Sequence, residues 1–170
     1  MKNLDFLIQV LTNVSNPLEL SILGPKEDIQ YWQECKKLIS KLPAHIKIVV
    51  GDEISPEKVH ETFVKYDLFV FPTRGENFGH VIPESLAAGT PILLSDRTPW
   101  LEDKLSGVQV LPLKEKLWIK AIEEWTNFSS DKIFLRRKAA LNYANKIKLI
   151  NEKSAKENKF LFDYKLSCLN

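Results

Sequence analysis

The stretch that decides the fold is Phe71-Pro-Thr-Arg-Gly-Glu-Asn-Phe-Gly-His-Val-Ile-Pro-Glu-Ser-Leu-Ala-Ala-Gly-Thr-Pro-Ile-Leu-Leu-Ser-Asp96. It predicts the end of an apolar strand, a turn, a helix over residues 79–88 and a second strand. Gly89 follows the helix at a position where glycine commonly ends one. Glu76 therefore falls in the loop after the first strand, and Glu84 on the second turn of the helix.

Two carboxylates with this spacing predict a ligand site. In an open parallel sheet, ligands bind at the carboxyl ends of the strands, and a helix N-terminus at that edge favours anions. Taken alone, Glu84 reads as a solvated helix residue and Glu76 as a loop residue. Their spacing, the intervening glycine and the strand-end context together favour the functional interpretation. A glycosidase pair is disfavoured because both carboxylates lie at a helix start suited to phosphate.

The rest of the chain alternates helix and strand. Apolar spacing predicts helices over 2–14 and 28–42, and Ser55-Pro56 reads as the N-cap and first turn of another. The predicted strands cover residues 18–23, 46–50, 68–71, 91–95 and 108–111, and helices follow over 116–125, about 131–148 and about 152–166. Strands that alternate with helices predict an α/β fold with a doubly wound parallel sheet.

Composition narrows the function classes. Lys and Arg number 24 against 22 Asp and Glu, so the balance of charge predicts no nucleic-acid partner. Cys35 and Cys168 fit no metal spacing and read as free thiols in a reducing compartment. No apolar run reaches membrane-spanning length, and the first residues break any signal-peptide pattern. We expect a cytoplasmic protein. A basic run over 132–165 reads as a solvated helix face, and a peripheral position at the inner face of the membrane is left open.

With these motifs the chain resembles the C-terminal, donor-binding domain of retaining glycosyltransferases that have two Rossmann domains, the GT-B architecture. More narrowly, it is similar to the group 1, family 4-like enzymes of bacterial polysaccharide and lipopolysaccharide synthesis. The resemblance rests on Glu76 and Glu84 with seven residues between them, on the flanking Pro-Thr and Ala-Ala-Gly-Thr-Pro, on Ser95-Asp96, and on Lys2-Asn-Leu-Asp. It covers nearly the whole chain and implies one Rossmann-like domain over 1–170, with C-terminal helices from about 115.

The resemblance also shows two departures. Relatives carry a strand ending in Gly-Arg before the lysine, and an acceptor-binding N-terminal domain before that. Here the sequence starts at Met1, so we expect a fragment whose first strand is missing. The two halves of the sheet would then close the gap, leave a groove or borrow a strand, and exposed edges would favour a homo-oligomer. Arg97-Thr-Pro-Trp100 stands where many relatives have Gly-Gly, which leaves the local donor or acceptor contacts open.

The resemblance implies a role for each site residue. Glu84 takes the two ribose hydroxyls, and Glu76, the catalytic residue, takes hydroxyls of the transferred sugar. Lys2 neutralises the leaving diphosphate, although a solvated terminal lysine is the equal alternative. The other donor-binding residues are Asn77, Phe78 and Gly79 at the sugar and phosphates, Ile54 near the base, and Arg74 at phosphate or base unless it faces solvent. No metal and no cofactor are expected, because a lysine and a helix N-terminus can replace Mg²⁺.

The implied reaction is retaining transfer of a sugar from a UDP- or GDP-type donor to a saccharide or lipid-linked acceptor. The isolated chain would not perform it without the acceptor domain. Two alternatives stay open. A nucleotide-sugar epimerase of the same architecture would release a different product. A non-catalytic nucleotide-sugar-binding module would form no product.

Overall fold

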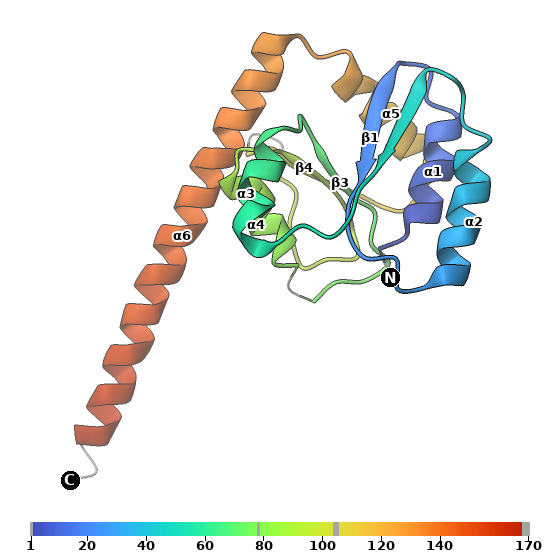
Figure 1. Cartoon of the computed structure of the whole chain (residues 1–170). Coiled ribbons are helices and arrows are strands. Elements are labelled where there is room, and N and C mark those ends of the chain that lie inside the picture. Colours follow the sequence, from blue (N-terminus) through green and yellow to red (C-terminus); the bar gives the residue numbers. More distant parts are fainter. Residues whose placement is uncertain (1, 78, 104–105, 168–170) are drawn as a thin grey trace.

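The structure is a computed structural model and describes residues 2–77, 79–103 and 106–167, with side chains up to Ile150. Helices and strands alternate along most of the chain (Figure 1). The elements are α1 (Leu4–Thr12), β1 (Leu18–Ile22), α2 (Ile29–Ile39), β2 (Ile46–Val50), α3 (Pro56–Val64), β3 (Phe69–Phe71), α4 (Val81–Ala87), β4 (Ile92–Ser95), β5 (Val108–Leu111), α5 (Glu115–Thr126) and α6 (Ser130–Ser167).

All named strand pairs are parallel, as predicted, but the strands form two sheets. β1 pairs with β2, with Leu18 opposite Ile46. The second sheet has the order β3-β4-β5, with Ile92 of β4 opposite Phe69 and Val108. Among the described residues no strand pairing joins β1 to β3. A single continuous sheet is therefore absent from the described part of the chain, and the two halves stay separate.

The core shows why the fold is doubly wound. Successive residues of a strand point to opposite faces. On β4, Leu93 packs into a cluster with residues of α1, α5 and β2, including the fully buried Trp118. Its neighbours Ile92 and Leu94 pack into a second cluster with α4, β5 and Ala140 of α6. Helices thus cover both faces of the three-stranded sheet, which confirms the fold class predicted from the sequence.

Of two predicted helix starts, that of α4 is wrong by two residues and that of α3 is confirmed. α4 begins at Val81 rather than at Gly79, because Gly79 has a φ of 61°, outside the helical region. Glu84 consequently lies in the first turn of α4 and not in the second. Ser55 is the N-cap of α3 and Pro56 is its first residue, as predicted, although the Ser55 side chain makes no capping hydrogen bond. The predicted end of α4 is confirmed: Gly89 has a φ of 71° and its N–H donates to the carbonyl of Leu86.

The two last predicted helices are one continuous helix, α6. The break predicted near residue 150 is wrong because neither glycine nor proline occurs between Ser130 and Ser167, and asparagine alone does not end a helix. α6 packs along α4 and then continues past the rest of the molecule (Figure 1). None of the described helices is both long and apolar enough to cross a membrane.

Candidate functional site

The start of α1 meets the loop after β3 at the carboxyl ends of the strands. Lys2, two residues before α1, places its Nζ 2.8 Å from Oε2 of Glu76. The same Nζ lies 4.7 Å from the ring centroid of Phe71, the last residue of β3. The Lys2 side chain is 66% exposed and that of Glu76 23% exposed. Two of the predicted site residues are thus brought into direct contact, with the lysine still open to solvent.

The loop that carries Glu76 is fixed from the neighbouring strand. Ser95, at the end of β4, donates from its Oγ to the carbonyl of Thr73 at 2.6 Å. Thr73 in turn donates from Oγ1 to the carbonyl of Gly75 at 2.9 Å, and the N–H of Glu76 donates to the carbonyl of Arg97 at 3.2 Å. Ser95 and Thr73 are both buried. The loop that leads to Glu76 is therefore held to the end of β4 by a buried hydrogen bond and to Arg97 by a backbone hydrogen bond.

Gly79 brings the backbone close to the stem of Glu76. A Cβ at this position would lie 2.7 Å from Cδ1 of Ile82 and 3.1 Å from Cγ of Glu76. The positive φ also favours glycine over any residue with a side chain. Asn77 is exposed, and Phe78 lies outside the described residues.

Glu84 has an exposed side chain on the first turn of α4. In the described part of the chain its carboxylate has no hydrogen-bond or salt-bridge partner. The structure thus brings Glu84 to the same loop-and-helix segment as Glu76, with no bond between the two carboxylates. Such a carboxylate is free to accept hydrogen bonds from a pair of hydroxyls.

Arg74 has an exposed side chain that nevertheless hydrogen-bonds to other residues of the protein. Its Nε donates to Oδ1 of Asn3 at 2.6 Å, and its Nη2 donates to Oδ2 of Asp5 at 3.1 Å. Asp5 also accepts, on Oδ1, a hydrogen bond of 2.7 Å from the hydroxyl of Tyr31 on α2. Sequence reasoning assigned no role to Asn3, Asp5 or Tyr31. The signal was present, because Asp5 belongs to the Lys2-Asn-Leu-Asp motif and lies one turn from the lysine.

The environment beside Asp5 keeps two groups protonated. Burial, followed by the hydrogen bond to Asp5, raises the pKa of Tyr31 well above its ordinary value. Burial also raises the pKa of the Cys35 thiol, which is fully buried. Tyr31 therefore acts as a neutral hydrogen-bond donor to the carboxylate.

The predicted base region lies at the end of the two-stranded sheet. Ile54 is half-buried in the loop after β2. In the same loop the N–H of Gly51 donates to the carbonyl of Ile22 at 3.0 Å, and Lys26 donates to the carbonyl of Gly51. The loops after β1 and β2 are thereby tied together. Ile54 thus lies at the carboxyl end of β2, in the other sheet from the loop that carries Glu76.

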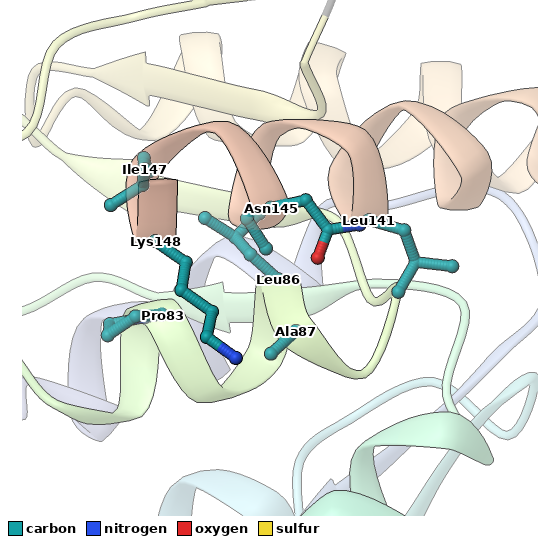
Figure 2. Close-up of a pocket in the computed structure, with 8 residues that line it drawn as sticks. Pro83, Leu86, Ala87, Leu141, Asn145, Ile147 and Lys148 are labelled. Atoms are coloured by element: carbon teal, nitrogen blue, oxygen red, sulfur yellow. The ribbon is translucent and has the colours of Figure 1, made fainter. Parts of the chain in front are cut away.

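A groove of about 330 Å³ lies elsewhere, between α4 and α6 (Figure 2). Leu86 of α4 and Leu141 of α6 contribute to its lining, and Lys148 extends across it toward α4. Glu76, Lys2 and Arg74 do not line it. Within the described residues, no group of three or more His, Cys, Asp or Glu side chains is placed to hold a metal ion.

Solved structures share this architecture. The chain superposes on the crystal structure of Anabaena HepE in complex with UDP-glucose with a TM-score of 0.73 and 17% identity, over 93% of this chain and 45% of that chain. Sucrose-phosphate synthase from Thermosynechococcus elongatus superposes with a TM-score of 0.71 and 17% identity, over 95% of this chain and 42% of that chain. The C-terminal domain of LpcC, a glycosyl transferase group 1 family protein from Francisella tularensis, superposes with a TM-score of 0.66 and 14% identity. The match covers 85% of this chain and 76% of that chain. A comparison with curated protein sequences finds no significant match.

These likenesses define the fold as that of a GT-B C-terminal, Rossmann-like domain. The family model for glycosyl transferases group 1 matches residues 1–127, which include every predicted site residue. The chain belongs to the glycosyl transferases group 1 family. It spans less than half the length of HepE and of sucrose-phosphate synthase, which are similar to it over nearly its whole length.

Proposed function

We propose that the chain is the donor-binding part of a retaining glycosyltransferase that takes a UDP- or GDP-type sugar. The observation that carries the proposal is the contact of 2.8 Å between Lys2 and Glu76. It joins a cation suited to a diphosphate and a carboxylate suited to sugar hydroxyls, at the edge of the sheet where parallel α/β folds bind ligands. A nucleotide sugar presents both chemical groups next to each other.

Each residue has a distinct role in this proposal. Glu84 accepts hydrogen bonds from the two ribose hydroxyls, and Glu76 accepts them from the transferred sugar. Lys2 releases Glu76 when the donor binds and pairs with the diphosphate. Backbone N–H groups at Asn77 and Gly79 face the sugar and phosphates, and the half-buried loop at Ile54 faces the base.

The proposed chemistry takes place on one face of the sugar. The bond from the anomeric carbon to the diphosphate oxygen breaks, and the leaving phosphate oxygen accepts the proton of the incoming acceptor hydroxyl. That hydroxyl oxygen then bonds to the same face of the anomeric carbon, which retains the configuration. Glu76 orients the sugar and is not the nucleophile. Lys2 stabilises the charge that develops on the diphosphate, so that no metal is required.

The proposal extends to the whole protein. Its acceptor is a saccharide or a lipid-linked saccharide of a bacterial surface polysaccharide. An N-terminal domain binds that acceptor, and the reaction takes place in the cytoplasm or at the inner face of the membrane. The group 1 family membership and the likeness to structures that hold UDP-glucose support the donor class.

Titration calorimetry with UDP and UDP-glucose, without added metal, tests the assigned roles. Glu84→Ala removes the acceptor for the ribose hydroxyls and should weaken binding of both ligands by about 1–3 kcal/mol. Glu76→Ala should weaken UDP-glucose binding and leave UDP affinity within about twofold, because its partner is the sugar. Glu61→Ala, an exposed carboxylate on the neighbouring α3, is the matched control and should change neither. Equal losses of UDP affinity at Glu76 and Glu84 would show that the roles are wrong.

A further inference from the structure

We infer that Asp5 and Tyr31 are positioning residues that hold Arg74 beside Lys2, so that two cations face the diphosphate of the donor. The inference rests on the proposed function and adds residues to the same site. It concerns three elements that are distant in sequence: α1, α2 and the loop after β3.

The guanidinium of Arg74 is anchored on one edge only. Nε donates to Asn3 and Nη2 donates to Asp5, while Nη1 has no hydrogen-bond partner among the described residues. The side chain remains 55% exposed. Because the guanidinium is planar and rigid, two anchored nitrogens fix the direction of the third. The free nitrogen is thus available to a ligand anion in a set orientation.

Asp5 is itself held from two sides. Oδ2 accepts from Arg74, and Oδ1 accepts from the Tyr31 hydroxyl at 2.7 Å. The Tyr31 oxygen also accepts the backbone N–H of Asp5 at 3.0 Å. An isolated surface ion pair adds little to stability, since two long side chains must be ordered for it. Here the hydroxyl of Tyr31 orders the carboxylate, and the carboxylate in turn orders the guanidinium.

Asn3 links Arg74 to Lys2. It is buried, with 2% of its surface exposed, and has a φ of 61°, a left-handed conformation that asparagine adopts more readily than most residues. Its Oδ1 accepts from Arg74, and the residue before it, Lys2, contacts Glu76. One network therefore sets the direction of both cations. A diphosphate has two charged groups side by side, which two such cations match better than one.

The alternative is that the network only fastens α1 to the loop and contributes to stability. The two roles differ in their dependence on the ligand. A fastening role affects UDP and UMP alike, through the shape of the whole site. A positioning role affects UDP more, because UMP lacks the second phosphate.

The test measures UDP and UMP affinities by calorimetry for the chain and for Asp5→Asn, Tyr31→Phe and Arg74→Met. We expect Asp5→Asn to weaken UDP binding about five- to tenfold, the range for one charge-assisted hydrogen bond, and UMP binding less than about twofold. Tyr31→Phe, which keeps the ring, should give a smaller loss of about two- to fourfold. In the Arg74→Met background, Asp5→Asn should add no further loss, because the residues act in series. Asp67→Asn, the same chemical change at an exposed aspartate outside the network, is the matched control.

Hydrogen exchange gives a second readout that needs no ligand. Asp5→Asn should speed exchange of the amides of Gly75 and Glu76, whereas Asp67→Asn should not. Equal losses for UDP and UMP, an additional loss in the Arg74→Met background, or an unchanged loop in Asp5→Asn would each overturn the inference. A parent chain that binds neither nucleotide defeats the proposed function and the inference together. A parent that binds UDP while Asp5→Asn and Tyr31→Phe bind it equally well defeats the inference alone.

Discussion

At the scale of the single residue, Gly79 ties backbone conformation to the candidate site. Its φ of 61° and the approach of Ile82 and Glu76 leave no room for a side chain. Gly79→Ala should lower the free energy of unfolding by about 1–3 kcal/mol, from left-handed strain and the close contact. Urea denaturation measures this change. Gly75→Ala, where a Cβ would meet nothing within 4 Å, is the control and should change stability by less than about 0.5 kcal/mol. A Gly79→Ala chain as stable as the parent would contradict the strain argument.

The residues of the site were predictable to different degrees. Glu76, Gly79 and Glu84 belong to one motif with fixed spacing and Lys2 belongs to a separate motif, and the structure brings Lys2 into contact with Glu76. Asp5 could have been singled out from its motif, but its pairing with Arg74 and with Tyr31 could not, because it depends on how α1 and α2 pack. A sequence shows which residues can bond, whereas the packing of α1 against α2 decides which of them meet.

At the scale of the element, α6 serves as a cap for another helix. Arg137 of α6 donates from Nη2 to the carbonyl of Val64 at 2.9 Å and from Nη1 to the carbonyl of Tyr66. These carbonyls lie at the end of α3, where backbone acceptors lack helical partners. Arg137→Met should therefore cost about 1–2 kcal/mol of unfolding free energy, measured by urea denaturation.

Lys138→Met is the matched control for Arg137→Met. Lys138 is the next residue on α6 and is exposed, so its substitution should change stability by less than about 0.5 kcal/mol. Equal effects of the two substitutions would show that the carbonyl contacts contribute nothing to stability.

Element types were predictable from apolar periodicity, and element boundaries less so. Strand β2 coincides with its prediction because Gly51 and the preceding loop limit it on both sides. α4 starts two residues late because Gly79 takes up a left-handed conformation for reasons of packing. α6 is one helix where two were expected, because neither glycine nor proline interrupts residues 130–167.

At the scale of the whole molecule, the separation of the two sheets is the main feature that the sequence left open. β1 and β3 are both terminal strands of their sheets, while residues of both sheets share one core cluster. Unpaired strand edges favour association with a further strand. Association of two copies through these edges stays a prediction.

In the proposed function one domain binds the donor and another binds the acceptor. The last prediction is therefore that this chain alone transfers no sugar. The two-body step requires the acceptor hydroxyl to be held against the anomeric carbon, and such positioning is worth roughly 7–11 kcal/mol at best. The proposed contacts to the donor do not position the acceptor hydroxyl. Incubation with UDP-glucose and GDP-mannose, each with oligosaccharide and lipid-linked acceptors, should give no glycosylated product by mass spectrometry. A two-domain group 1 enzyme, as the positive control, should form glycosylated product under the same conditions. Slow release of free sugar is compatible with the prediction, because water needs no acceptor site. Transfer at a rate comparable to that of the two-domain enzyme would contradict it and would mean that this chain holds an acceptor as well as a donor.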